Sequence, residues 1–135
     1  MTDTLTIRQD TCTITLYLPK LTDLPLKNIR KLFAMALSEP LTNENAIQTL
    51  GPCLEEMVAA SKADWNEASR IYQREWRLIE KPTRRRTRKE IQETAKIKAH
   101  NAELTKQLKH TKAKYGHWVK IQALWNDTKH KMNFQ

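Results

Sequence analysis

The chain has 135 residues, about the size of one domain, of which 39% are hydrophobic and 29% charged. Its charge is uneven, because residues 1–80 carry 9 Lys and Arg against 11 Asp and Glu, whereas residues 81–135 carry 15 against 4. Two cysteines, two glycines and no apolar run of membrane-spanning length argue against a disulfide scaffold, a glycine-rich phosphate loop and a transmembrane helix.

The first 18 residues alternate apolar and polar side chains. Leu5 and Ile7 fall on one face, and the alternation resumes from Cys12 to Leu18 after a short polar break. This period of two predicts a β-hairpin. A two-stranded ribbon is marginal by itself in water, so its apolar face is expected to pack on helices or on a partner chain.

Two short helices are predicted next. The segment Thr22-Asp23-Leu24-Pro25 combines capping side chains with a proline, which is typical of a helix start, and the helix is expected to run to about Ser38. A second short helix is expected from Asn43 to Leu50. Gly51-Pro52 then predicts a break before the following helix.

Two long helices complete the chain. Residues 52–80 have apolar side chains at spacings of three and four, and Pro82 is expected to stop this helix. A long basic helix is predicted for residues 83–130, with Thr87 and Glu90 spaced as a capping box and a kink at Gly116 left open. Helices joined by so short a loop are expected to form an antiparallel hairpin.

The last helix also carries a seven-residue period, which is typical of coiled-coil-like packing and is weakened by Asn101 and Thr111. The positions of this period are Ile97, Leu104, Thr111, Trp118 and Trp125. The expected fold is therefore α+β but mostly helical, in one domain over residues 1–135. An N-terminal β-hairpin and two short helices precede a long helical hairpin.

A run of cations marks the start of the basic half. Six of the nine residues from 81 to 89 are Lys or Arg, including Arg84, Arg85, Arg86 and Arg88. A helix N-terminus is the positive end of the helix dipole, so local stability does not explain these arginines. An external anion does, because guanidinium groups and first-turn amides bind phosphate together. The alternative is a solvated turn in which they pair with Glu75, Glu80, Glu90 or Glu93.

Lysines continue this basic surface along the last helix. Each alone is an ordinary solvated side chain, but the four carboxylates that follow residue 80 cannot offset them together. Such cations position a phosphate backbone without reading its sequence. The candidate nucleic-acid or anion-binding residues are Arg84, Arg85, Arg86, Arg88, Lys89, Lys96, Lys98, Lys109, Lys112 and Lys120.

Aromatic and catalytic patterns add little to this interpretation. Trp118 and Trp125 are assigned to the buried seam of the helical hairpin, whereas Trp76 falls off the main apolar stripe of its helix. The four histidines have no HExxH spacing or CxxC partner, so no metal site, cofactor or enzymatic activity is expected.

The sequence thus predicts a non-catalytic DNA-binding or RNA-binding protein in the cytoplasm, without a membrane partner. An alternative is a small interaction or inhibitor protein that docks on an acidic protein surface or a ribonucleoprotein machine, as phage-type inhibitors such as anti-CRISPR proteins do. A homodimer through the hairpin edge or the helical seam is a third alternative.

Overall fold

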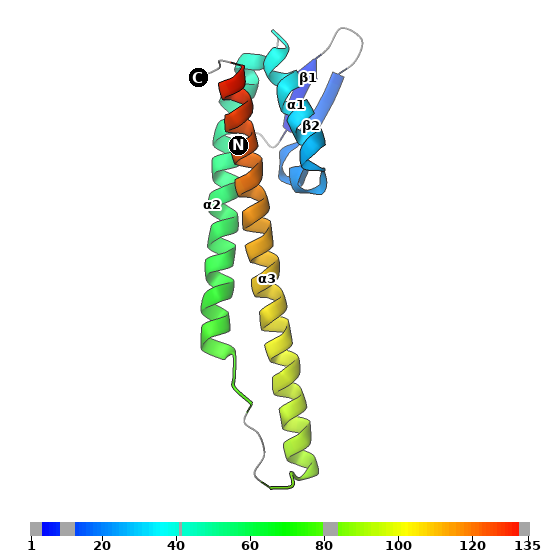
Figure 1. Ribbon diagram of the computed structural model, residues 1–135, viewed down its shortest axis with the longest axis vertical. Helices are drawn as coiled ribbons and strands as arrows, with labels where there is room; N and C mark the ends of the chain where they lie inside the picture. Colours follow the sequence, from blue (N-terminus) through cyan, green and yellow to red (C-terminus); the bar gives the residue numbers. More distant parts are fainter. Residues whose placement is uncertain (1–3, 9–12, 41, 80–83, 133–135) are drawn as a thin grey trace. The chain divides into compact units, whose positions relative to one another are not determined.

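The computed structural model describes residues 4–8, 13–40, 42–79 and 84–132. Within them, strands β1 (Thr4–Arg8) and β2 (Thr13–Tyr17) form an antiparallel hairpin, followed by a 3-10 helix, η1 (Leu18–Asp23). Three α-helices follow (Figure 1): α1 (Leu26–Ser38), α2 (Asn43–Glu75) and α3 (Arg88–Lys131). The prediction of a mostly helical α+β fold with an N-terminal hairpin is confirmed.

The chain divides into two compact units. The first unit comprises residues 1–61 and 114–135, and therefore holds the β-hairpin, η1, α1, the start of α2 and the end of α3. The second unit comprises residues 62–113, and therefore holds the rest of both long helices. The prediction that the whole chain is one domain stays a prediction.

The core of the first unit covers the apolar face of the β-hairpin. Leu5 and Ile7 of β1 and Leu16 of β2 are buried in the same cluster as residues of α1. In that cluster Phe33 of α1 meets Trp125 of α3 edge to face, with ring centroids 5.2 Å apart and an interplanar angle of 75°. The requirement that a two-stranded ribbon be covered is therefore met within this unit.

The segment between β2 and α1 differs from the prediction. Residues 18–23 form η1, and α1 begins at Leu26 with Pro25 as its N-cap rather than at Thr22. A 3-10 helix has three residues per turn, so Leu18 and Leu21 fall on one side, and both are buried. The burial of this pair accounts for the tighter helix.

The break expected at Gly51-Pro52 is absent, and that prediction was wrong. α2 runs unbroken from Asn43 to Glu75 with Pro52 inside it. Proline removes one helical hydrogen bond, which disfavours a helix interior. Here Leu50 and Leu54, four residues apart on either side of the proline, are both fully buried. The burial of one continuous face outweighs the loss of that hydrogen bond.

α2 ends at Glu75, five residues before the predicted end, and the reason lies in α3. The Arg77 N–H donates to Asn101 Oδ1 at 3.1 Å, and Asn101 Nδ2 donates to the Arg77 carbonyl at 2.7 Å. In a longer helix the Arg77 N–H would bond the carbonyl of Gln73. The Asn101 amide replaces that bond and directs the chain out of the helix, so Asn101 fixes the helix end as well as occupying the seam.

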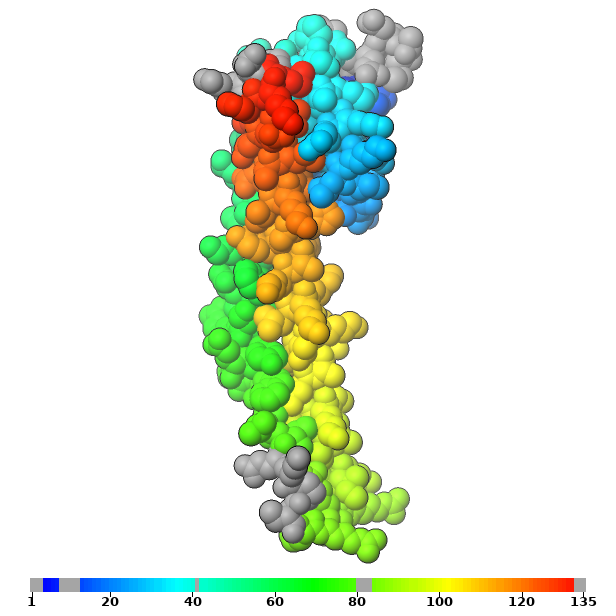
Figure 2. Space-filling model, viewed as in Figure 1, coloured from blue at the N-terminus to red at the C-terminus, as the bar shows by residue number. Residues whose placement is uncertain are grey.

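Two contacts between side chains show how α2 and α3 pack within the second unit. His100 meets Glu75, and Lys112 lies 6.0 Å from the centre of the Trp65 ring. From the first contact to the second, the residue number on α2 falls from 75 to 65 while that on α3 rises from 100 to 112, so the helices are antiparallel. Figure 2 shows these parts of α2 (green) and α3 (yellow) side by side.

The seam of the second unit is only partly closed. Among the described residues of this unit, Asn101 and Leu104 are the two side chains classed as buried. Trp65 and Tyr72 on α2, like Thr111 on α3, remain half-buried.

Gly116 lies inside α3 without a break, and a Cβ there would meet nothing within 4 Å.

Candidate nucleic-acid interface

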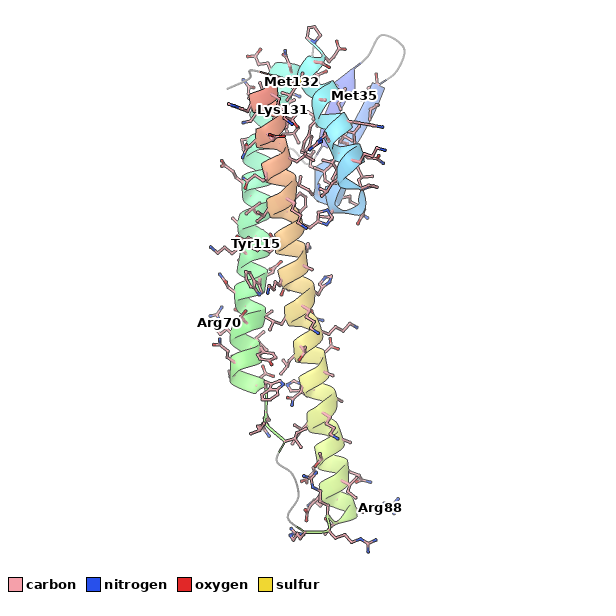
Figure 3. All side chains as sticks on the ribbon, viewed as in Figure 1. Met35, Arg70, Arg88, Tyr115, Lys131 and Met132 are labelled. Carbon is pink, nitrogen blue, oxygen red and sulfur yellow. The ribbon has the colours of Figure 1, made fainter. Side chains whose placement is uncertain are left out.

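The turn before α3 and the first residues of α3 present most of the predicted arginines to solvent. Arg84, Arg85, Arg88 and Lys89 are exposed, and Figure 3 shows Arg88 at the first residue of α3, away from α2. Thr87 caps the helix, since its Oγ1 accepts the Glu90 N–H at 3.2 Å. This bond is one half of the predicted capping box.

Two of these arginines have partners within the protein. Arg84 Nη2 lies 3.0 Å from Glu90 Oε1, and this hydrogen bond holds the pKa of Glu90 below its ordinary value. Arg86 is half-buried and donates from Nη1 to Thr94 Oγ1 at 2.8 Å. Arg86 therefore braces the start of α3 rather than presenting its charge, and Arg84 is shared between Glu90 and solvent.

The predicted lysines are all exposed. Lys98 and Lys109 lie eleven residues apart on one face of α3, beside the half-closed seam, and neither forms an ion pair with a described residue. Lys112 is placed over the Trp65 ring, and Lys120 belongs to the first unit. The last turn of α3 is different, because Lys131 pairs with Asp127 at 3.2 Å.

A basic cavity of about 260 Å³ lies where α2 ends in the second unit. Its lining residues are Arg74, Glu75, Arg77, Lys96, Ile97, His100 and Asn101. Hydrogen bonds with Arg74 and then with His100, each 3.0 Å long, lower the pKa of Glu75. Its carboxylate is thus engaged, while Arg77 and Lys96 form no ion pair with the described part of the chain. This cavity can accept an anion.

A second basic cavity, of about 470 Å³, belongs to the first unit and was not predicted. Its lining residues are Leu26, Lys27, Arg30, Lys120, Ala123, Leu124 and Asp127. Lys27 and Arg30 come from the near-neutral half of the chain. Residues three apart share one face of a helix, so the sequence does indicate that these two cations are neighbours. They were not singled out because their half of the chain is nearly neutral overall. The structure brings both cations to the same cavity as Lys120.

Trp76 is the exposed member of an aromatic pair. It follows the last residue of α2 and is 39% exposed, and its backbone N–H donates to the Tyr72 carbonyl at 2.9 Å. The two rings are stacked, with centroids 6.1 Å apart and an interplanar angle of 25°. By contrast, Trp118 and Trp125 are buried, as predicted.

Other types of site find no support in residues 4–8, 13–40, 42–79 and 84–132. No three His, Cys, Asp or Glu side chains are grouped there as a metal ion would require. No helix in these ranges is both long enough and apolar enough to cross a membrane. Comparison with protein-family models, with curated proteins and with solved structures finds no match to this chain.

Proposed function

We propose that this protein is a non-catalytic nucleic-acid-binding protein that contacts phosphates through the turn before α3 and along α3 itself. The observation that supports this function is a set of exposed cations that have no counter-ion among the residues the structure describes. Arg85, Arg88, Lys89, Lys98 and Lys109 are exposed and form no ion pair with any described residue. These positive charges repel one another, and binding of a polyanion relieves that repulsion.

The chemistry of these groups defines the kind of binding. Contacts from Lys and Arg to phosphate position a nucleic acid but carry no sequence information. Affinity would come largely from the release of condensed counter-ions and would therefore fall steeply with salt. The proposal covers both DNA and RNA. A cytoplasmic location fits it, because two cysteines in 135 residues give no disulfide framework and nucleic acid is within reach there.

The experiment is a salt titration of binding to labelled DNA duplexes, single strands and RNA, with the wild type and the double variant Arg85→Ala/Arg88→Ala. Each lost phosphate contact should reduce the slope of log K against log salt by about 0.9 on duplex DNA. Folding should be unaffected, since both side chains are exposed and Ala favours the helix at position 88, inside α3. Absence of binding at low salt would overturn the proposal.

A matched control removes the same charge elsewhere in the second unit. Lys62 and Arg70 are exposed on α2, away from the turn in sequence, and Lys62→Ala/Arg70→Ala changes the net charge equally. The control should keep the wild-type slope. Equal losses in the two double variants would show that net charge alone, and not the turn, determines binding.

A second candidate function is that of a small inhibitor or adaptor docking on a protein or ribonucleoprotein machine. It is supported by two large apolar side chains, Leu78 and Ile91, which are 75% and 57% exposed. A pull-down from the native host with and without nuclease separates the candidates, because only a protein partner survives digestion. Light scattering tests the homodimer alternative.

A further inference from the structure

Trp76 is held in a defined orientation although much of it faces solvent. An indole normally contributes to stability by burial, yet this one is 39% exposed in a protein whose Trp118 and Trp125 are almost completely buried. Its backbone is bonded to Tyr72, and its ring is stacked on the Tyr72 ring. The exposed part of the indole is therefore oriented in advance, so binding to it costs little further conformational entropy.

In the chain, Trp76 lies between two residues that line the basic cavity. Glu75 and Arg77, the neighbours of Trp76 on each side, both line the basic cavity of 260 Å³, to which Lys96 also contributes. The backbone of Arg77 is fixed by the Asn101 amide, while its side chain is exposed. The exposed indole is therefore one residue away, along the chain, from residues that line the cavity on either side.

This pairing matches a particular form of nucleic acid. Proteins that bind single strands combine a basic groove for the phosphates with aromatic side chains on which bases stack. In a duplex the faces of the bases are covered by their neighbours, so a protein ring reaches them only where a base is unpaired.

We propose that the stacked pair Tyr72–Trp76 receives an unpaired nucleobase while the cavity lined by Arg77 and Lys96 receives the adjoining phosphate. The site then binds single-stranded nucleic acid in preference to duplex. This inference rests on the proposed function and assigns it a class of ligand. Leu78 and Ile91, which are exposed but not aromatic, have no part in it.

The test compares two labelled single strands of equal length, an oligothymidylate and an abasic strand that keeps its phosphates but lacks bases. Wild-type protein should bind the oligothymidylate more tightly than both the abasic strand and a duplex. Trp76→Ala should weaken oligothymidylate binding by roughly 5- to 150-fold, the range for loss of one stacked base. It should leave binding of the abasic strand and the duplex unchanged, and Trp76→Phe should recover part of the loss.

Leu78→Ala is the matched control, because it removes an exposed apolar side chain two residues away and should change none of these affinities. Equal loss on all three ligands would mean that Trp76 is structural, and an unchanged affinity for oligothymidylate would mean that no base stacks there. Either result overturns the inference and leaves the proposed function standing. If the wild type binds none of the ligands at low salt, the proposed function fails and the inference fails with it.

Discussion

At the scale of single residues, Glu90 is the internal competitor for the candidate site. Its carboxylate holds the Arg84 guanidinium at 3.0 Å, and its pKa is lowered by that hydrogen bond. A carboxyl group with a lowered pKa keeps its contact above the ordinary glutamate value of about 4.3 and loses it as the pH falls through the lower, folded-state pKa. Arg84 is therefore engaged at neutral pH.

Glu90→Gln should release Arg84 for the ligand. Glutamine preserves the side-chain length and the capping pattern with Thr87, so α3 should begin at the same residue. We expect tighter binding to duplex DNA and a slope of log K against log salt that is steeper by about 0.9. Glu93→Gln removes the same charge from an exposed side chain without an ion pair to a described residue, and its slope should not change. Equal slopes would contradict the competition.

The arginines from 84 to 88 also show which side-chain environments can be predicted from the sequence and which cannot. Exposure of Arg84, Arg85 and Arg88 follows from charge density alone, and the structure agrees. The half-burial of Arg86 does not follow, because it depends on a hydroxyl eight residues later, on Thr94. Likewise, Lys27 and Arg30 could not be assigned beside Lys120, since that cavity exists only once α1 meets α3.

At the scale of elements, the end of α2 depends on a side chain of α3. Asn101 is buried, and its side-chain amide makes both of its hydrogen bonds with the backbone of Arg77. Asn101→Ala should lower the free energy of unfolding by about 1–3 kcal/mol, because a buried pair of bonds is lost. Denaturant unfolding measures the effect, and amide exchange at Arg77 reports the bond directly.

Asn66→Ala is the control for this substitution, since Asn66 is an exposed asparagine on α2. Its effect should stay within about 0.5 kcal/mol, as for most surface changes. If the two variants unfold at the same denaturant concentration, the Asn101 amide does not stabilise the hairpin and the early end of α2 needs another explanation.

The same elements show why sequence patterns located helices better than their ends. Period-two and period-three-to-four spacing predicted the β-hairpin and the long helices, because burial of one face determines both patterns. The prediction of a break at Gly51-Pro52 was wrong because the burial of Leu50 and Leu54 outweighs the local cost of a proline inside the helix. The predicted end of α2 near residue 80 was wrong because the contact with Asn101 replaced a helical hydrogen bond. A contact between residues so far apart in the chain cannot be read from local sequence patterns.

At the scale of the whole molecule, the two units differ in how completely they close their cores. Residues such as Phe33, Leu50 and Ile121 in the first unit are fully buried, whereas the described residues of the second unit include only Asn101 and Leu104 as buried side chains. Local opening is easiest where few apolar contacts are buried. The half-closed seam therefore predicts lower local stability in the unit that carries the candidate site.

Native-state hydrogen exchange should show this difference. Backbone amides around Leu50–Leu54 and Ile121–Trp125 should be protected more strongly than those around Ala68–Tyr72, although all lie within α-helices. Adding single-stranded DNA should raise protection in the second unit if its site is occupied. Uniform protection along α2 would contradict the expected difference in stability.

The contact between Asn101 and Arg77 has one further consequence, for the length of the segment between the helices. Arg77 is tied to Asn101 at one end, and Arg86 and Thr87 bond to the first turns of α3 at the other, so both helix ends are secured by the outermost residues of the connecting segment. The entropy of closing a flexible loop grows only logarithmically, and doubling its length costs about 0.6 kcal/mol. The segment between Arg77 and Arg86 can therefore change its length at little cost while the two helix ends stay in place.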